Sequence, residues 1–342
     1  MTDIYIHYLH GRDVEALAMT DDEIIAAVEG ALVAQARGQA IIEPRMHLVP
    51  EKGSTRGHFN VLRGVVQPLG LAGVKIVGDF FDNYRHDLPS EMAMLYLADP
   101  KTGRPIAMID ATAITTMRTG AVTAIGAKYL AKKGAKVLGH VGARGTAFWN
   151  IKLMDRLFDF DEIRVHSRRK ESRDAFAAKI GDALGKKVIA TEDWQACVEG
   201  ADIIVDASRL EAPAPMLKNA WIKKGCLVMP YGTMSAVEDN LPDIIDKWVM
   251  DDFGQAHAGK FGALRRQIDS GRLNRDNLHA EIGEIAAGLK PGRERDDETI
   301  LFWHRGLSLS DIALGAAMLD KAKKMGLGQQ LFYAHFEAGE NH

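Results

Sequence analysis

Cysteine, excess charge of one sign and long apolar runs are all scarce in this sequence of 342 residues. Its two cysteines, Cys197 and Cys226, are too few for a disulfide framework, which favours reduced thiols and predicts a cytoplasmic protein. A formal net charge of -3 lacks the basic excess that attracts nucleic acids and membrane surfaces, so neither partner is expected. No apolar run approaches the roughly 20 residues of a membrane span. The N-terminus also lacks the basic flank and apolar core of a signal peptide.

Patterns for metal binding and for hydrolysis are missing as well. His257, His279 and His304 are too scattered to form a metal site, and no metal is predicted. No Ser/His/Asp arrangement favours a hydrolase. The composition is that of a globular protein, with 46% hydrophobic and 26% charged residues. A chain of this length is expected to fold as two domains, each large enough to bury a core.

One glycine-containing turn near the middle of the chain organises the rest. The apolar, β-rich run 137–141 leads directly into Gly142 and Gly145, and a segment with helical spacing follows. This is the strand, turn and helix that open a dinucleotide-binding βαβ unit, in which free N–H groups of the helix meet a pyrophosphate. The positions in this turn that we expect to bind a cofactor are Gly142, Arg144, Gly145, Thr146 and Ala147.

The flanking segments extend this unit into a larger sheet. Further strands are expected at 163–167, 188–189, 201–208, 225–231 and 248–252, with helices between several of them, including 171–184 and 278–287. Strands that alternate with helices favour a parallel sheet covered on both faces. The predicted fold class is therefore α/β, with a Rossmann-type doubly wound parallel sheet.

The first 115 residues read as a separate α+β region. A capping box at Thr20 and Glu23 predicts a helix, and a Gly-containing turn is expected at 51–57. Antiparallel strands are expected at 58–62, 71–77, 92–97 and 105–109, with a hairpin turn at 99–103. A helix at 307–323 is of the kind that returns to the first domain. We therefore predict an α+β domain made of 1–115 with 310–342, and a dinucleotide-binding domain at 116–309.

Several short motifs, taken together in this order and spacing, give the sequence a specific resemblance. The chain is similar to the ornithine cyclodeaminase and mu-crystallin family over nearly its whole length. The matching segments are Pro44-Arg45, 71–77, Asn83, 88–90, 99–105, 116–119, 142–147, 281–284, 291–293 and Asp311.

The resemblance implies a nicotinamide-dependent enzyme that acts on a small-molecule α-amino or α-imino acid. It also implies that the first domain binds substrate and forms a homodimer. The family's cations for the substrate carboxylate correspond to Arg45, Lys75 and Arg118, which we expect to converge over the nicotinamide ring. Lys75 interrupts an apolar strand, where an unpaired charge is costly, whereas an arbitrary surface cation would be the ordinary alternative. Family positions near the cofactor correspond to Ser90, Thr119 and Ser208.

The second strand of the dinucleotide unit indicates which cofactor is used. NAD-binding versions of the fold usually place an acidic residue at the end of this strand. Here Ser167 stands there, followed by Arg168 and Arg169, which would accept a 2′-phosphate. We predict NADP(H) in preference to NAD(H), unless these arginines merely begin a solvated helix. Arg144 replaces the second glycine of the family turn, and it would either crowd the pyrophosphate or bind a phosphate.

A second departure from the family concerns proton transfer. Cyclodeaminases carry an aspartate where we align Met234, and methionine cannot shuttle a proton. Glu238 or Asp239 would take this role only if the alignment gap moved; the ordinary reading is that they are loop carboxylates. Cyclodeamination needs managed proton transfers throughout, whereas reduction of a preformed imine asks for less.

The expected activity is therefore reduction of an α-imino acid (ketimine) to an α-amino acid, or the reverse. The alternatives are a true ornithine cyclodeaminase, which converts ornithine to proline and ammonia, and a mu-crystallin-like ligand-binding protein. Four residues are weaker candidates for substrate contact. His58 and Asn60 lie on a strand predicted to face the cleft, and Met234 and His304 depart from the family. For His58 and His304 a structural role is the alternative.

Overall fold

The computed structural model describes residues 2–50, 57–208, 210, 214–232, 234, 236–257 and 264–336. The predicted turn at 51–57 therefore lies, apart from Gly57, outside the described residues. Contacts divide the chain into two compact units, and each is described by itself. Unit 1 consists of Met1–Arg118 and Leu307–His342, and unit 2 of Thr119–Gly306.

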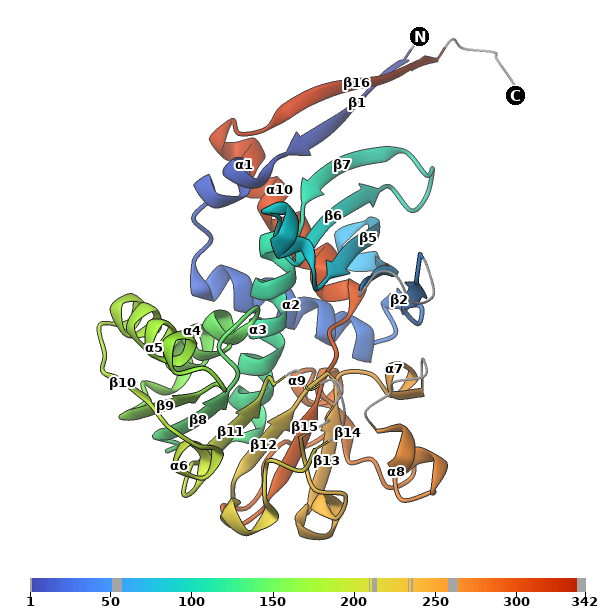
Figure 1. Cartoon of the computed structure of the whole chain (residues 1–342). Coiled ribbons are helices and arrows are strands. Elements are labelled where there is room, and N and C mark those ends of the chain that lie inside the picture. The colour runs from blue at the N-terminus through green and yellow to red at the C-terminus, as the bar shows by residue number, and fades with distance from the viewer. Residues whose placement is uncertain are drawn as a thin grey trace. The chain divides into compact units, whose positions relative to one another are not determined.

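Unit 1 is built on an eight-stranded sheet (Figure 1). Its strand order is β16-β1-β7-β6-β5-β4-β2, and β3 pairs with β4. The antiparallel run from β4 to β7 confirms the predicted strands, which are longer than expected. The strands are β1 (Thr2–Leu9), β2 (Ala40–Ile42), β3 (Met46–Leu48), β4 (Gly57–Val66), β5 (Leu71–Phe80), β6 (Glu91–Ala98), β7 (Pro105–Asp110) and β16 (Gln329–Phe336).

The helices of unit 1 bury one face of this sheet. Leu95 and Ile109 sit on that face without solvent exposure, and the approach of α10 is close. A Cβ on Gly73 would lie 2.6 Å from Ile312 Cγ1, so only glycine permits this approach. The helical elements are α1 (Gly11–Ala16), α2 (Asp21–Ala36), η1 (Gln67–Leu69), η2 (Asn83–His86), α10 (Ser308–Met325) and the first turns of α3 (Thr112–Leu130). Helix α2 begins with the predicted capping box.

Unit 2 carries a second eight-stranded sheet, in the order β10-β9-β8-β11-β12-β15-β13-β14. Every described pair in it is parallel, which confirms the predicted α/β fold with a parallel sheet. Its strands are β8 (Val137–Val141), β9 (Glu162–His166), β10 (Val188–Ala190), β11 (Ile203–Asp206), β12 (Leu227–Pro230), β13 (Lys247–Met250), β14 (Ala280–Glu281) and β15 (Ile300–Trp303).

Helices cover both faces of this parallel sheet. Successive strand residues point to opposite faces: His140 contacts Asn150 of α4, whereas Val141 packs with Trp194 and Cys197 of α6. The helices are α4 (Ala147–Phe158), α5 (Lys170–Leu184), α6 (Trp194–Val198), η3 (Asn219–Trp221), η4 (Leu241–Ile244), α7 (Phe253–His257), α8 (Arg265–Asp269) and α9 (Ile282–Ala286). The helix expected at 278–287 is shorter than predicted, because Ala280 and Glu281 pair with β13.

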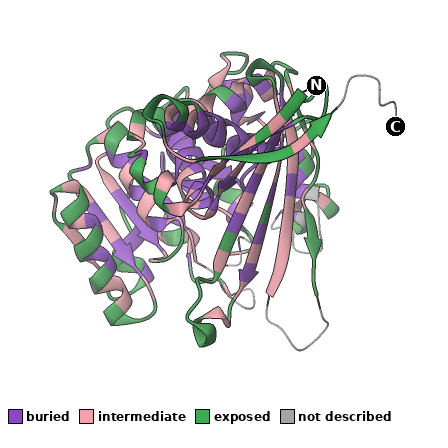
Figure 2. Ribbon diagram, turned by 90° about the horizontal axis from the view of Figure 1, so that it is seen from above, coloured by how far each residue is buried: buried purple, intermediate pink, exposed green. Residues whose placement is uncertain are grey.

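Burial separates the two interiors from the exposed edges (Figure 2). The central strands of unit 2 are buried and those of unit 1 are buried mainly on one face, whereas almost all of β16 is exposed. Both cysteines are free and buried, and burial raises the pKa of each thiol to about 12, so both are unreactive at neutral pH. Among the described residues, no helix has the length and apolar composition to cross a membrane.

Candidate active site

Two of the three predicted carboxylate-binding cations meet inside unit 1. The Lys75 side chain leaves β5 on the face covered by α10. Its Nζ donates to Asp311 Oδ1 at 2.6 Å and to Thr115 Oγ1 at 3.1 Å. Arg118 Nε donates to the same Asp311 oxygen at 2.8 Å. The Lys75 and Asp311 side chains have no solvent exposure, and that of Arg118 is only 6% exposed. Buried charges of this kind are tolerated because they are paired.

The charges around Lys75 adjust its protonation. Burial lowers the pKa of Lys75 to about 7; the charges of Arg118 and, more weakly, Arg45 act in the same direction, whereas Asp311 opposes them. The contribution of Arg45 means that the third predicted cation lies close enough to act on Lys75. Lys75 therefore titrates near neutral pH, instead of remaining fully protonated as an exposed lysine does.

This cluster leaves hydrogen-bonding capacity unused. Arg118 Nη1 and Asp311 Oδ2 are buried and have no hydrogen-bond partner among the described residues. A buried polar group without a partner costs roughly 1 to 3 kcal/mol, and each such group needs an explanation, such as a ligand or an ordered water. A guanidinium N–H that has no partner can donate a strong, charge-assisted hydrogen bond to a carboxylate ligand.

The weaker unit 1 candidates lie on the same sheet. His58 Nε2 and Asn60 Nδ2 are 3.1 Å apart, and the His58 ring lies 5.3 Å from that of His47. The register pairs Asn60 with Val77, two residues beyond Lys75, so both candidates point to the Lys75 face. Ser90 is exposed just before β6, and its carbonyl accepts a hydrogen bond from Phe80.

In unit 2, the predicted glycine turn joins β8 to α4. Gly142 has φ +106°, and a Cβ there would lie 2.7 Å from the Ala207 carbonyl oxygen. Gly142 N donates to the His166 carbonyl at 2.9 Å, which ties the turn to β9. Helix α4 starts at Ala147, directly after the turn, so its first N–H groups face this edge of the sheet. These features fit a dinucleotide pyrophosphate, which needs a close backbone and a helix N-terminus.

The two glycines of this turn differ in a way that mutagenesis can test. Gly142→Ala is expected to lower the free energy of unfolding of the chain by about 3 kcal/mol, because it adds a backbone clash to a strained φ. Gly145→Ala is the matched control: its φ is +56° and nothing lies within 4 Å of the added Cβ, so about 1 kcal/mol is expected. Denaturant unfolding with cofactor titration measures both; equal effects would contradict the close approach.

The other predicted cofactor positions follow neighbouring parallel strands. Because the sheet is parallel, Ser167 after β9 and Ser208 after β11 lie at the same edge as the glycine turn. Strand order reverses between β8 and β11, which is where such sheets bind nucleotides. Ser208 N donates to the buried Asp206 carboxylate at 2.9 Å, and burial raises the pKa of Asp206 to about 6.

The two arginines predicted to determine the cofactor preference are exposed. Arg168 and Arg169 follow β9, and Ser167 Oγ donates to the Arg169 carbonyl at 3.4 Å. Arg144 is also exposed, in the glycine turn. Thr119 is buried in α3, and its carbonyl accepts a hydrogen bond from Thr123.

A buried polar network that the sequence did not reveal begins at the same edge. Asn150 Nδ2 contacts His140 Nε2 at 3.0 Å and donates to the Tyr231 hydroxyl at 3.1 Å. The Tyr231 hydroxyl also bonds Thr146, the residue before α4. Burial lowers the pKa of His140 to about 4, so this imidazole is neutral. The network connects the glycine turn to the end of β12; a histidine in an apolar strand was the one sequence signal for it.

His304 belongs to this network. It is fully buried, lies 3.0 Å from Thr123 Oγ1 through its Nε2, and stacks on Tyr231 with ring centroids 4.7 Å apart. Thr123 Oγ1 also lies 3.1 Å from Asn150 Oδ1. These contacts hold His304 inside unit 2, and its contact with substrate stays a prediction.

The segment aligned with the cyclodeaminase aspartate offers no free carboxylate among its described residues. Met234 has φ +50°, and its side chain packs against an apolar cluster that includes Trp303. Glu238 accepts from Asn219 N at 2.7 Å, which lowers the pKa of Glu238, and Asp239 pairs with Arg266 at 3.1 Å. Both carboxylates are therefore engaged with neighbouring loop residues.

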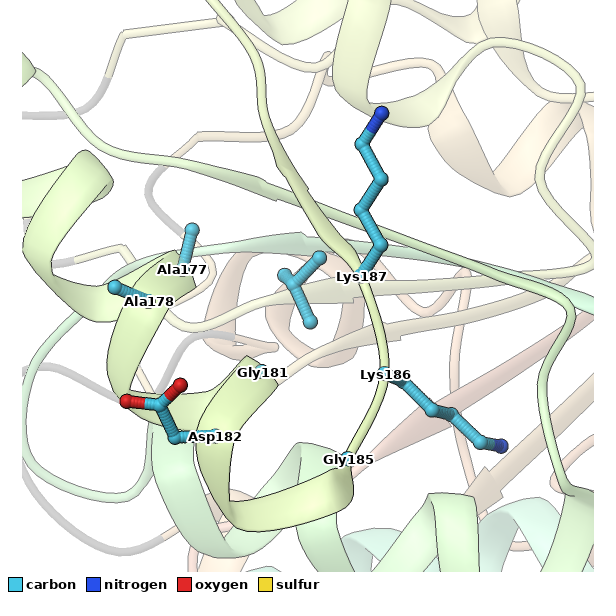
Figure 3. A pocket seen from close by; sticks show the side chains of 8 residues that line it. Ala177, Ala178, Gly181, Asp182, Gly185, Lys186 and Lys187 are labelled. Atoms are coloured by element: carbon cyan, nitrogen blue, oxygen red, sulfur yellow. The ribbon is translucent and has the colours of Figure 1, made fainter.

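A separate hollow lies between α5 and β10 (Figure 3). It is lined by Ala177, Gly181, Lys186 and Lys187, among others. Lys186 is held by Asp155 at 2.9 Å. Because β10 begins directly after these lysines, the hollow lies at the amino edge of the parallel sheet, opposite the glycine turn. It is not the predicted cofactor site. Across the described ranges, no three His, Cys, Asp or Glu side chains gather to hold a metal ion.

The strand order of the parallel sheet reverses next to the glycine turn. Together these features define a dinucleotide-binding α/β protein. The chain belongs to the ornithine cyclodeaminase/mu-crystallin family, whose sequence model matches residues 7–326. The family resemblance predicted from the sequence is thus confirmed.

Relatives with stated activities are similar over nearly the whole chain. Alanine dehydrogenase of Archaeoglobus fulgidus is 32% identical over 324 residues, covering 94% of this chain and 96% of the relative. The structure of Thermococcus litoralis Δ1-pyrroline-2-carboxylate reductase with NADH and L-proline matches with TM-score 0.87, 28% identity and coverage of 95% and 99%. An archaeal alanine dehydrogenase dimer with bound NAD matches with TM-score 0.86, 29% identity and coverage of 96% and 99%.

Proposed function

We propose that this chain is an NADP-dependent oxidoreductase that reduces an α-imino acid to an α-amino acid, or catalyses the reverse, with the substrate carboxylate bound by Arg45, Lys75 and Arg118. The observation that carries the site is the buried cluster around Asp311, with its unused Arg118 nitrogen. The class of enzyme agrees with the relatives, which are amino-acid dehydrogenases and imine reductases.

The cluster's charge suits a small anionic substrate. With Lys75 protonated, three cations and the single carboxylate of Asp311 leave two net positive charges. An α-imino acid offers one strong handle, its carboxylate, and hydrogen bonds between charged groups are the strongest that a side chain can make. Arg118 presents its free nitrogen to this carboxylate while Asp311 holds its Nε.

Unit 2 supplies the cofactor site. When bound, a nicotinamide cofactor supplies the hydride that reduces the imine carbon and takes it back in the reverse reaction. The backbone at Gly142 and the first N–H groups of α4 would bind the pyrophosphate. Arg168 and Arg169 would bind a 2′-phosphate, and Arg144 a further phosphate oxygen. The similar solved structures hold NADH or NAD, so the NADP preference is specific to this proposal.

A spectrophotometric screen tests the proposal. NADPH absorbance should fall when the protein is mixed with preformed cyclic imino acids, or with 2-oxo acids and ammonia. A true cyclodeaminase would instead convert ornithine and release ammonia with no net change in cofactor. Turnover of ornithine alone would replace this proposal with that activity, although the loop at Met234 provides no described proton shuttle. Cytoplasmic localisation stays a prediction from the sequence.

The outer face of the unit 1 sheet supports a homodimer. Residues paired across neighbouring strands point to the same face of the sheet. On the face away from Lys75, two rows of such paired residues are apolar. Met46, Leu48, Ile76 and Met92 are exposed within these rows, and Ile76 is 47% exposed. Contiguous exposed apolar surface of this kind marks an interaction site. We assign it to a second copy of the chain, in line with the dimer of the archaeal relative.

Ile76→Glu is expected to convert the dimer into a monomer. The substitution buries a charge in the interface, which costs several kcal/mol unless the charge is paired. Sedimentation velocity measures the change, and Met325→Glu is the control because Met325 is equally exposed but lies at the end of α10. A monomeric wild type, or a dimeric Ile76→Glu protein, would contradict this interface.

A further inference from the structure

We propose that Asp311 is a positioning residue of the carboxylate site: its buried Oδ1 holds Lys75 and Arg118 in one arrangement and favours the charged form of Lys75. This inference rests on the proposed function, because it concerns the same carboxylate site. It adds a residue for which the family resemblance gave no role.

The geometry assigns both cations to a single oxygen. Lys75 Nζ and Arg118 Nε lie 2.6 and 2.8 Å from Oδ1, so their directions are linked through one atom. The three groups come from β5, α3 and α10, which fixes Asp311 relative to both cations. Asp311 also sits in the first turn of α10, where the helix N-terminus favours a negative charge. The carboxylate is therefore fixed between the two cations, and its side chain has no solvent exposure.

The presence of an acid in this place needs a functional reason. A negative charge beside a site for anions opposes substrate binding by like-charge repulsion. Stability alone explains it poorly, because a buried ion pair is often no more stable than apolar residues of the same volume. Two arginines close to a buried lysine would, however, drive the most easily deprotonated of the three cations, Lys75, to lose its proton. Asp311 offsets that loss while leaving Arg118 Nη1 free for a ligand.

The groups that face Lys75 determine the sign of the effect. Four groups on other elements face Lys75: Thr115 and Arg118 on α3, Asp311 on α10, and Arg45 before β3. On the sheet itself, Asp79 and His58 lie on the same face as Lys75, further along the strands. Asp311 raises the pKa of Lys75, whereas burial and the two arginines lower it. Removal of the Asp311 charge therefore lowers the pKa of Lys75 from about 7. The carboxylate site then loses its Lys75 charge at a lower pH than in the wild type.

Binding of pyrrole-2-carboxylate, a flat carboxylate that carries no reducible imine, tests this without turnover. Calorimetric titrations are run on both sides of neutral pH with the wild type and Asp311→Asn, which keeps the shape and removes the charge. Wild-type affinity should fall as pH rises through about 7. In Asp311→Asn the pH midpoint of this fall in affinity should lie at least about one pH unit lower. Above both midpoints the variant should therefore bind about tenfold more weakly. Below both midpoints the two proteins should differ far less.

Three further variants separate positioning from general damage. Ser310→Ala changes a buried neighbour on α10 without touching charge and should leave the midpoint unchanged. Thr115→Val removes the neutral partner of Lys75 and should shift the midpoint less than Asp311→Asn. Asp311→Glu keeps the charge but displaces it, so affinity should fall while the midpoint stays near the wild-type value. This last variant tests the inference even where Asp311→Asn fails to fold.

These titrations test the role of Asp311 separately from the proposed activity. An unchanged midpoint in Asp311→Asn, or an equal loss of affinity at every pH, overturns the inference. A wild type that binds the carboxylate with the predicted shift but reduces no imino acid overturns the proposed activity and supports the role of Asp311. A wild type that binds no carboxylate overturns both.

Discussion

Lys75→Met should lower kcat/KM for the imino acid by about two to three orders of magnitude. The substitution removes a buried cation from the carboxylate site and leaves the Asp311 carboxylate facing Arg118 alone. Truncating one partner of a buried, hydrogen-bonded charge pair costs about 2 to 5 kcal/mol, and each 1.4 kcal/mol is about tenfold in an equilibrium constant. Methionine fills a similar volume, so the loss should appear in substrate binding and turnover, with cofactor binding to unit 2 unchanged.

Lys321→Met provides the control for this experiment. Lys321 is also a unit 1 lysine paired with a carboxylate, Glu23 at 2.7 Å, but the pair is partly exposed. Such pairs contribute at most about 1 kcal/mol, so activity should stay within twofold of the wild type. A Lys75→Met protein with full activity would contradict the role of Lys75 in the carboxylate site.

Loss of the two arginines after β9 should reverse the cofactor preference. Arg168→Ala combined with Arg169→Ala is expected to lower kcat/KM for NADPH by about one to two orders of magnitude. Each hydrogen bond to a charged group contributes roughly 1.5 to 3 kcal/mol, and the exposure of these arginines reduces that amount. The value for NADH should change little, because NADH carries no 2′-phosphate. Steady-state kinetics with both cofactors measures the ratio.

Lys187→Ala is the matched control, since Lys187 is an exposed cation of unit 2 at the opposite edge of the sheet (Figure 3). It should alter neither cofactor's kinetics. A wild type that prefers NADH would remove the predicted selectivity and would bring the chain into line with the similar structures that hold NADH or NAD.

Local sequence patterns were enough to predict the parallel sheet and its glycine turn. An apolar run that enters Gly142 describes a strand and a turn within ten residues, and the turn's chemistry is local. Lys75 could be singled out because it places a charge inside an apolar strand. The structure then gives it buried partners, which agrees with the cost of leaving such a charge unpaired.

Features that depend on distant contacts could not be predicted in this way. Lys75 and Asp311 are 236 positions apart, so nothing local indicates that they meet. Strands β1 and β16 pair the two ends of the described chain, and neither was predicted. The polar network of Asn150 and Tyr231 also joins residues from separate elements, and each of them alone reads as an ordinary helix or strand-end residue.

Transfer of deuterium from cofactor to product tests the central claim most directly. NADPH that carries deuterium on the transferable face of its nicotinamide ring is incubated with the protein and a preformed imino acid such as Δ1-pyrroline-2-carboxylate. We predict one deuterium at Cα of the amino acid formed for each NADPH oxidised, measured by mass spectrometry and NMR. Amino acid without deuterium, or no oxidation of NADPH with any α-imino acid, would contradict the account.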